Sequence, residues 1–582
     1  MRFPKNPFAP LFAALLASLL AGCGAGDQKP LSAILITLDT TNPTALGTYR
    51  GLAGLTPNLD ALAAESLVYE NGRSVAPLTL PSHASMLTGL YPARHTVRAN
   101  GLNPLPGSAS TLAEHAREAG YQTAAFVSSV VLMAPFGLDQ GFDVYDEPEE
   151  QPEQGIRHTA ERSARQVTAA ALDWLKRRDR DRPFLLWVHY YDPHAPHRAV
   201  ARFQQQIQSL GNFRFPGYLA EVAQMDAAIG GLLGELRREQ VLEHALLSVV
   251  ADHGESLGRH DEESHTIFIY DTTIRVPLLL RYPDGYRAGD RSKAIVSVVD
   301  LFPTFLEGLG LGDPERVDGQ SLYRQGVPAD RGVYFESYSG YLSFGWSPLT
   351  GWADARGTYL HGARPKLFLA NDVLQDQNRI EQQRALAREY REGIRSVHDA
   401  PALPRQDESV EQDFSAELLA LGYIGGGSAD DLLPHPLEVA DLPPPEDHAL
   451  EVEAMSRMAL EAGLDRPEEV IRNLQDLLAR VPENSFMAEL LGRLLSNQDR
   501  HQEVIDLLAP RMVPGRERMT SMGLLASAYE RAGRSNEALE VFLRAHRLWP
   551  GRAQFTGGAI RLLRELGHDR EADDLLKQLP GR

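Results

Sequence analysis

Cysteine is almost absent from this sequence, which has one, Cys23, among its 582 residues. The chain therefore has no intrachain disulfide, and no thiol is available to an active site elsewhere in it. Clusters of lysine and arginine are missing too, and the formal net charge is −20, from 58 basic and 78 acidic residues. Because nucleic-acid binding depends on clustered basic side chains, this composition disfavours a nucleic-acid partner.

The apolar run from Leu11 to Leu20 follows Arg2 and Lys5 and is too short to span a bilayer comfortably, which predicts a secretory signal. It ends in "LAGC", and this order of features resembles the lipobox of bacterial lipoproteins. The resemblance implies a signal peptide at residues 1–22, a lipidated Cys23 and a tether over 23–30. The alternative is an ordinary cleaved signal with an incidental cysteine. Gly24 in place of aspartate favours the outer membrane, so we expect a lipid-anchored protein of the bacterial cell envelope on its periplasmic face.

Residues 31–400 alternate apolar runs with helical patterns. The runs "AILITLD", "YQTAAFVSS", "PFLLWVHYYD", "ALLSVVADHG" and "VPLLLRYP" are typical of strands buried on both faces of a mostly parallel sheet. Segments such as "TPNLDALAAES" and "YLAEVAQMDAAIGGLLGELRREQ" have apolar residues at helical spacing. The pattern predicts an α/β fold, with helices packed on both sides of a central sheet.

Polar residues follow three of these runs: Asp39, Asp192 and the pair Asp252-His253. Ligands of open α/β sheets bind beyond the carboxyl ends of the strands, so all three groups are expected to converge on one site.

A stretch rich in proline, glycine and acids over residues 401–445 predicts a linker. From 446 to 582 the pattern is helical with a period of 34 residues. Leu525, Ala526, Tyr529, Ala538 and Phe542 stand at the offsets of the tetratricopeptide repeat, with a generic helical bundle as the alternative. Such repeats stack into a solenoid whose groove commonly binds peptides or helices, so we expect a protein or peptide partner.

The stretch "PLTLPSHASMLTG" has the layout of a helix start, with Pro81 at the first helical position and Thr79 just before it. A threonine here can be a helix cap or a nucleophile. Asp39, Asp252 and His253 are the ligand types that a divalent metal prefers, and a threonine bound to that metal would ionise more readily than a free one.

These segments occur in the order of a known family. "ILITLDTTNPTALGTYR", "LTLPSHASMLTGLYPARH", "GYQTAAFV", "YDPHAPH", "SVVADHGESLG" and "VVDLFPTFLEGLG" resemble the sulfatase branch of the alkaline phosphatase superfamily. The resemblance implies an alkaline-phosphatase-like sandwich. It also implies a metal bound by Asp39, Asp252 and His253, with Thr79 as a nucleophile that itself contacts the metal.

The chain departs from sulfatases at four places. A sulfatase carries at position 79 a cysteine or serine that is oxidised to formylglycine, and threonine cannot be oxidised in this way. The arginine four residues later is His83 here, and the second of two consecutive aspartates is Thr40. The lysine and histidine expected after "GYQTAAF" are absent.

Thr79 instead resembles the nucleophile of the superfamily's phosphodiesterases and phosphoglycerol or phosphoethanolamine transferases, which act through a phosphothreonine. The diesterases hold a second metal with an aspartate and two histidines, for which Asp192, His194 or His197, and His265 are the candidates. Protonated His194 and His265 are the alternative to a second metal, as catalytic groups that stabilise the transferred oxygens and activate water or an acceptor hydroxyl. His194 and His197 can also be plain loop histidines.

The expected enzyme is therefore a metal-dependent hydrolase or transferase of phosphate esters, preferably diesters, with Arg98 and Asn100 as possible substrate contacts. A salt-bridging Arg98 is the alternative for that residue. Carboxylate ligands suit Mg, Mn or Ca, and added histidines favour Zn. The competing functions are a true sulfatase, against which Thr79 argues, and a lipid-anchored scaffold with an inactive catalytic domain.

Overall fold

The computed structural model describes residues 31–101, 103–148, 161–195, 197–312, 316–324, 326–404, 433–439, 441–448, 451, 467–482, 484–513, 517–550 and 552–577. The predicted signal peptide, lipidated Cys23 and the whole tether lie outside these residues, as does much of the predicted linker. None of the helices in the described ranges combines the length and the apolar character needed to cross a bilayer.

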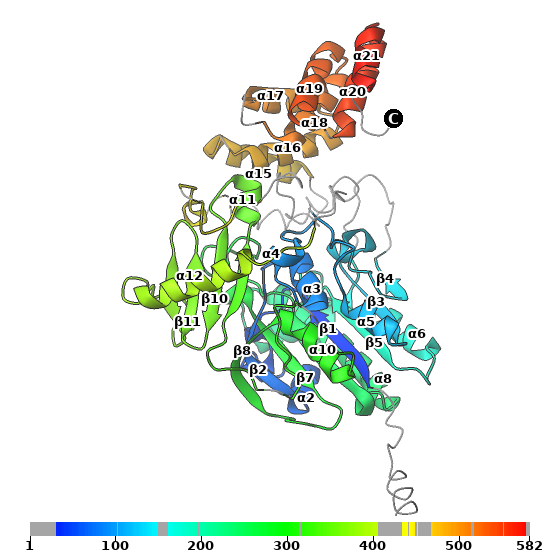
Figure 1. The fold of residues 1–582 in the computed structure, drawn as a ribbon, viewed down its shortest axis with the longest axis vertical. Helices are drawn as coiled ribbons and strands as arrows, with labels where there is room; N and C mark the ends of the chain where they lie inside the picture. The colour runs from blue at the N-terminus through cyan, green and yellow to red at the C-terminus, as the bar shows by residue number, and fades with distance from the viewer. Residues whose placement is uncertain are drawn as a thin grey trace, which may run out of the picture.

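An eight-stranded sheet forms the centre of the larger domain (Figure 1). Its spatial order is β4-β3-β5-β1-β6-β7-β2-β8, and neighbouring strands are parallel except on the two sides of β7. The mostly parallel sheet predicted from the apolar runs is thus confirmed, although "VPLLLRYP" forms its antiparallel member. The strands are β1 (Ser32–Leu38), β2 (Leu67–Arg73), β3 (Gln122–Phe126), β4 (Val144–Asp146), β5 (Phe184–Tyr190), β6 (Ala245–Ala251), β7 (Arg275–Arg281) and β8 (Arg291–Ser297).

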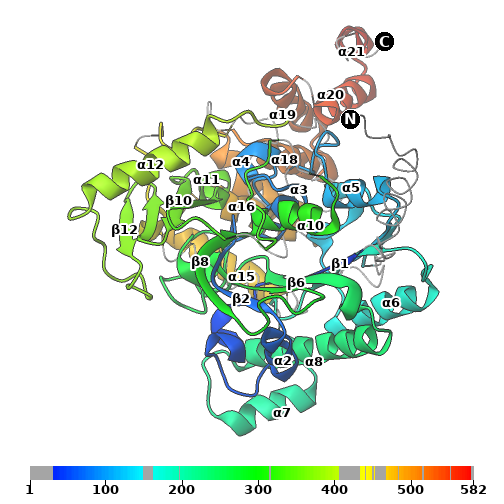
Figure 2. The same cartoon turned by 60° about the horizontal axis from the view of Figure 1, so that its bottom comes forward.

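Helices cover the sheet in two packed groups, as Figure 2 shows. One group consists of α3 (Thr79–Thr88), α5 (Leu112–Glu118) and α10 (Leu301–Leu309), and the other of α2 (Pro57–Ala64), α6 (Ala164–Arg177), α7 (Ala201–Leu210) and α8 (Pro216–Arg238). Short helices α4 (Pro92–His95), α9 (Asp271–Ile274) and α11 (Ser339–Phe344) lie in the connections. One continuous apolar core joins the sheet to both groups, because β1, β5 and β6 are buried along their whole length.

A second, antiparallel sheet has the order β12-β11-β10-β9 and is covered by α12 (Arg384–His398). Its strands are β9 (Val333–Ser337), β10 (Leu349–Asp354), β11 (Gly357–His361) and β12 (Lys366–Leu369). The described end of the predicted linker contacts this region: Pro443 accepts a hydrogen bond from the backbone of Ser347, at 2.9 Å.

The C-terminal region is helical. It consists of α15 (Pro467–Arg480), α16 (Ser485–Asn497), α17 (His501–Leu508), α18 (Met519–Arg531), α19 (Ser535–Leu548), α20 (Ala553–Glu565) and α21 (Asp569–Leu576). Each helix packs against the next along the chain. The repeat positions Leu525, Ala526, Ala538 and Phe542 are buried between the helices. A helical C-terminal region is therefore confirmed, and its assignment as tetratricopeptide repeats stays a prediction.

Candidate functional site

The register of three adjacent strands brings Asp39 and Asp252 together. Leu38, the last residue of β1, pairs with Tyr190 of β5 on one side and with Ala251 of β6 on the other. Hydrogen bonds continue the ladder by one residue, because Asp39 N–H donates to the carbonyl of Tyr190 (2.9 Å) and Asp252 N–H donates to that of Leu38 (3.2 Å). Both carboxylates are fully buried, so the predicted convergence at the carboxyl ends of the strands is observed for these two residues.

Helix α3 brings Thr79 to the same place. The helix begins at Thr79, two residues earlier than predicted, and Leu78 is its N-cap. Pro81 is compatible with this start because the first four N–H groups of a helix have no partner within the helix. The Thr79 side chain does not cap the helix. Its hydroxyl oxygen instead lies 3.4 Å from Nε2 of His253.

Four side chains surround a point where a metal would fit. His253 donates from Nδ1–H to the carbonyl of Gly254 (3.0 Å), which leaves a lone pair on Nε2. This nitrogen is 3.8 Å from Oδ1 of Asp39 and 3.6 Å from Oδ2 of Asp252. Atoms that bind a tetrahedral ion with bonds of about 2.1 Å are roughly 3.4 Å apart, so the observed separations, including that to Thr79, suit a shared cation.

The hydrogen bonds of the two carboxylates support the same interpretation. Oδ1 of Asp252 accepts from the backbone N–H groups of Thr40 (3.2 Å) and His253 (2.7 Å). Within the described part of the chain, Oδ2 of Asp252 and both carboxylate oxygens of Asp39 have no hydrogen-bond partner. A buried carboxylate without partners is costly. A divalent ion would compensate both charges, and Asp39, Asp252 and His253 form a group whose ligand atoms lie within 4.8 Å of one another.

Burial sets the protonation of this cluster. It raises the pKa of Asp39 well above its usual value, and the neighbouring charge of Asp252 raises it further. Burial likewise raises the pKa of Asp252. It lowers the pKa of His253 well below its usual value, with His265 as the next cause. The imidazole is therefore neutral, as a metal ligand must be, and a bound cation would favour the ionised carboxylates.

The predicted catalytic histidines lie beside this cluster. The ring of His265 is 4.5 Å from that of His253, and the ring of His194 is 5.2 Å from that of His265. Nδ1 of His265 is 3.3 Å from a carboxylate oxygen of Glu255, and Nδ1 of His194 is 2.7 Å from the hydroxyl of Tyr191. The imidazole of His265 therefore lies close to those of both His253 and His194.

The ligand set predicted for a second metal is not assembled. Oδ2 of Asp192 accepts from the backbone N–H of Ala164 at the start of α6 (2.6 Å), and Oδ1 accepts from Gln224 (2.7 Å). His197 faces Glu221, with 3.1 Å between Nδ1 and the carboxylate. Asp192 thus stabilises the beginning of a helix. Both of its carboxylate oxygens already accept hydrogen bonds. Asp192 therefore does not join Asp39 and Asp252, although it also follows a strand.

The two predicted substrate contacts differ in their surroundings. The guanidinium of Arg98 forms a two-fold ion pair with Glu336 (2.7 and 2.5 Å) and lies over the ring of Tyr338. It corresponds to the salt-bridging alternative, although its side chain is only 9% exposed. Asn100 accepts the backbone N–H of Leu80 on Oδ1 (2.9 Å). Its Nδ2 is buried and has no partner among the residues that the structure describes, so it remains available to a ligand oxygen.

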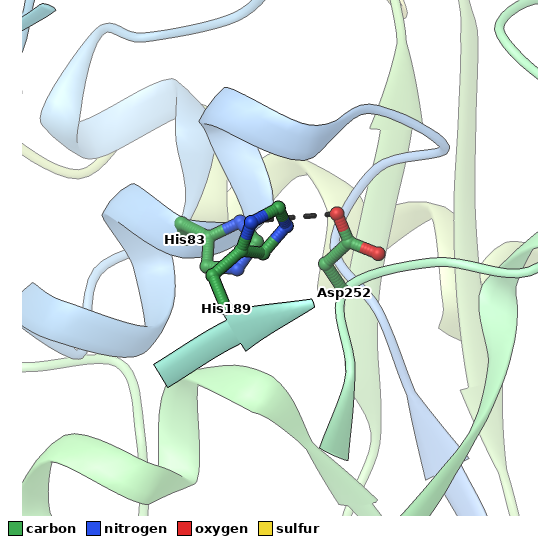
Figure 3. A group of neighbouring side chains, drawn as sticks. All are labelled: His83, His189 and Asp252. Carbon is green, nitrogen blue, oxygen red and sulfur yellow. Dashed lines mark ion pairs between the residues drawn. The ribbon is translucent and has the colours of Figure 1, made fainter. Parts of the chain in front are cut away.

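Two buried histidines that sequence reasoning did not assign to the site lie on its other side. His189 interrupts the apolar run of β5, and that interruption is the signal that could have identified it. His83 stands where the sulfatase pattern has an arginine, and its position in the sequence does not by itself indicate a role in the site. Figure 3 shows both imidazoles beside the carboxylate of Asp252. Ligand atoms of the three residues lie within 4.8 Å of one another.

A mostly parallel sheet with metal-type ligands at adjacent strand ends and a hydroxyl at the start of a helix is the arrangement expected of an ester hydrolase of the alkaline phosphatase superfamily. The model of the sulfatase family matches residues 32–311. Residues 32–311 are therefore similar to a sulfatase-family hydrolase domain, and enzymes of that family are metal-dependent.

Proteins that are similar to this chain in sequence or in fold are named as hydrolases of sulfate esters and of phosphonate esters. An ulvan-active sulfatase of Formosa agariphila is 27% identical over 328 residues, which cover 50% of this chain and 63% of that protein. Human N-acetylgalactosamine-6-sulfatase is 29% identical, with 54% and 70% covered. The structure of a phosphonate monoester hydrolase of Agrobacterium radiobacter has a TM-score of 0.52 at 21% identity, with 63% and 94% covered, and shows the shared fold.

Proposed function

We propose that this domain hydrolyses phosphate esters, with a preference for diesters, through a covalent phosphothreonine at Thr79. The observation that carries the proposal is the position of the Thr79 hydroxyl, at the start of α3 and 3.4 Å from Nε2 of His253, beside the carboxylates of Asp39 and Asp252. Threonine cannot supply the formylglycine of a sulfatase, and the one cysteine of the chain stands at position 23.

In the first half of the reaction, Thr79 Oγ1 forms a bond to phosphorus while the bond to the leaving oxygen breaks. The threonine proton ends on the leaving alcohol. A divalent cation held by Asp39, Asp252, His253 and Thr79 would supply the positive charge that favours the ionised hydroxyl. The Asn100 Nδ2–H group can donate to an oxygen of the transferred group, at the N-terminus of α3, where the helix dipole favours negative charge.

In the second half, a water oxygen attacks phosphorus and Thr79 recovers its proton. Burial lowers the pKa of His194 well below its usual value, so this imidazole is neutral and does not serve as the charged group expected for it from the sequence. We assign His265, which faces Glu255, to the acceptance of the proton from water. An acceptor hydroxyl in place of water would give transfer instead of hydrolysis.

The charge of the site favours a diester. Asp39, Asp252 and Glu255 are all buried there. Within the described ranges, no lysine or arginine forms an ion pair with them. A phosphodiester carries one negative charge, whereas a monoester carries up to two at neutral pH. A divalent ion would compensate the charges of Asp39 and Asp252, and the remaining negative charge of Glu255 repels the diester less than the monoester.

The test compares turnover of aryl phosphate diesters, monoesters and sulfates by the metal-supplemented full chain and by Thr79→Ala. We expect diester cleavage that falls by about 10³-fold or more in the variant, and a phosphoryl group on the peptide that contains Thr79 after rapid acid quenching. Thr79→Ser, which keeps a hydroxyl, is the matched control and is expected to retain part of the activity. Diester cleavage that persists in Thr79→Ala, or sulfate turnover that exceeds diester turnover, contradicts the proposal.

We also propose that Cys23 anchors the protein to the bacterial envelope on its periplasmic side, and that the C-terminal helices bind a protein or peptide. The lipobox-like "LAGC" and the 34-residue pattern support these assignments. Incorporation of labelled palmitate that is lost in Cys23→Ser tests the anchor, and failure to incorporate label in the intact chain would contradict it.

A further inference from the structure

The proposed reaction leaves two buried histidines beside the metal cluster without a role. His83 comes from α3 and His189 from β5, their ring centres are 5.0 Å apart at 81°, and both face Asp252 (Figure 3). The three residues could hold a second cation, or the histidines could act through hydrogen bonds. The hydrogen bonds of each ring distinguish the two possibilities, because a nitrogen that carries a proton cannot bind a metal.

The proton of His189 is located by its neighbours. The backbone N–H of Ser128 donates to Nδ1 of His189 (3.3 Å), which uses the lone pair of that nitrogen. The neutral ring then carries its proton on Nε2. Nε2 lies 3.4 Å from Oδ2 of Asp39 and, among the described residues, makes no hydrogen bond. His189 thus presents an N–H group, and not a lone pair, to a buried carboxylate.

His83 has the opposite tautomer. Its Nδ1–H donates to the carbonyl of Thr79 one turn earlier in α3 (2.8 Å), which leaves a lone pair on Nε2. Burial lowers the pKa of His83 to about 4, so the ring is neutral. One imidazole and one oxygen of Asp252 are only two ligands. With His189 as a hydrogen-bond donor, this group falls short of a metal site.

We propose that His189 is a positioning residue: its Nε2–H donates to Oδ2 of Asp39 and turns Oδ1 toward Nε2 of His253, where the cation of the proposed function would lie. The proposal rests on that function. The strand geometry supports it, because His189 pairs with Thr37 in the β5–β1 register, two residues before Asp39. The present 3.4 Å separation is longer than a formed hydrogen bond, and we expect it to shorten once Asp39 carries its full charge against a cation.

The experiment measures binding of Mn²⁺ and Zn²⁺ to the metal-free full chain by competition with a chromogenic chelator, and metal content by elemental analysis. We expect one ion per chain in the site. Loss of a group that orients a metal ligand typically weakens affinity about 10- to 100-fold, which is the effect expected for His189→Ala. His189→Gln, whose amide N–H reaches about as far as Nε2–H, is expected to stay within a few-fold of wild type.

His244→Gln, which replaces an exposed histidine, is the matched control and should bind like wild type. If His189→Ala does not fold, His189→Asn replaces it, because its shorter amide cannot reach Asp39 and should bind as weakly. Equal affinity in wild type and both shortened variants overturns the proposal, as does a second ion that is lost in His189→Gln. A wild-type chain that binds neither metal contradicts the proposed function itself.

Discussion

Glu262 is a buried residue whose carboxyl group accepts hydrogen bonds from two parts of the loop that carries His265. One carboxylate oxygen accepts the backbone N–H of Ile267 (2.9 Å), and the other accepts the hydroxyl of Ser256 (3.0 Å). The residue is 1% exposed, and burial raises its pKa to about 7. The Glu262 side chain therefore links the segments before and after His265 through hydrogen bonds. Its carboxyl group is protonated over part of the physiological pH range.

This raised pKa predicts a pH-dependent stability. Between about pH 4.5 and 7 the folded chain holds a proton on Glu262 that the unfolded chain has released, so the free energy of unfolding falls as pH rises, by up to about 3 kcal/mol from this group. Glu262→Gln removes that component and keeps an acceptor for Ile267 N–H. Urea unfolding of the metal-free protein from pH 5 to 8 should show a shallower decline in the variant. Identical slopes would contradict the prediction.

At the scale of elements, the sequence predicted the sheet and missed parts of the site. Continuous apolar runs identify β1, β5 and β6, and their ends position Asp39 and Asp252. The apolar runs do not show in which direction the side chain that follows a strand points. Asp192 follows β5, but its carboxylate points to the start of α6 and not to Asp39. His189 lies within a strand, and it becomes part of the site because α3 places His83 beside it. This packing between distant segments is not visible in the sequence. The exact start of α3 was missed because a proline fits any position in the first turn of a helix.

Helix α3 ends at Thr88, and the conformation and packing of its C-cap, Gly89, yield a prediction. Gly89 has φ of 70°, and a Cβ there would meet Phe302 Cδ1 at 2.9 Å. Gly120 has φ of 86° and open space around its Cα, so it is the matched control. We expect Gly120→Ala to cost about 1 kcal/mol from the left-handed backbone alone. Gly89→Ala should cost about 1–3 kcal/mol more because of overpacking. Chemical denaturation measures both, and equal losses would show that α10 yields to the added methyl group.

At the scale of the whole molecule, the C-terminal helices share an apolar cluster with the catalytic domain. Ile267 and Phe268, which follow His265, belong to the same buried cluster as Trp346 and side chains of α15 and α16. Helix α11 contacts α16 directly (Figure 1). The helical region is thereby connected to the loop that carries a proposed catalytic histidine.

Trp346 is the side chain through which this connection can be tested. It is 3% exposed and stacks on Phe344 and His448, with ring centres 4.1 and 4.5 Å away. Replacing a buried tryptophan by alanine typically costs about 3–5 kcal/mol. We expect Trp346→Ala to increase hydrogen exchange in α16 and to separate the unfolding of the helical region from that of the catalytic domain in calorimetry. Trp549→Ala removes the same side chain from within the helical region and should leave exchange in the loop around His265 unchanged. If Trp346→Ala leaves a single transition and unaltered exchange in α16, the shared cluster does not couple the two parts.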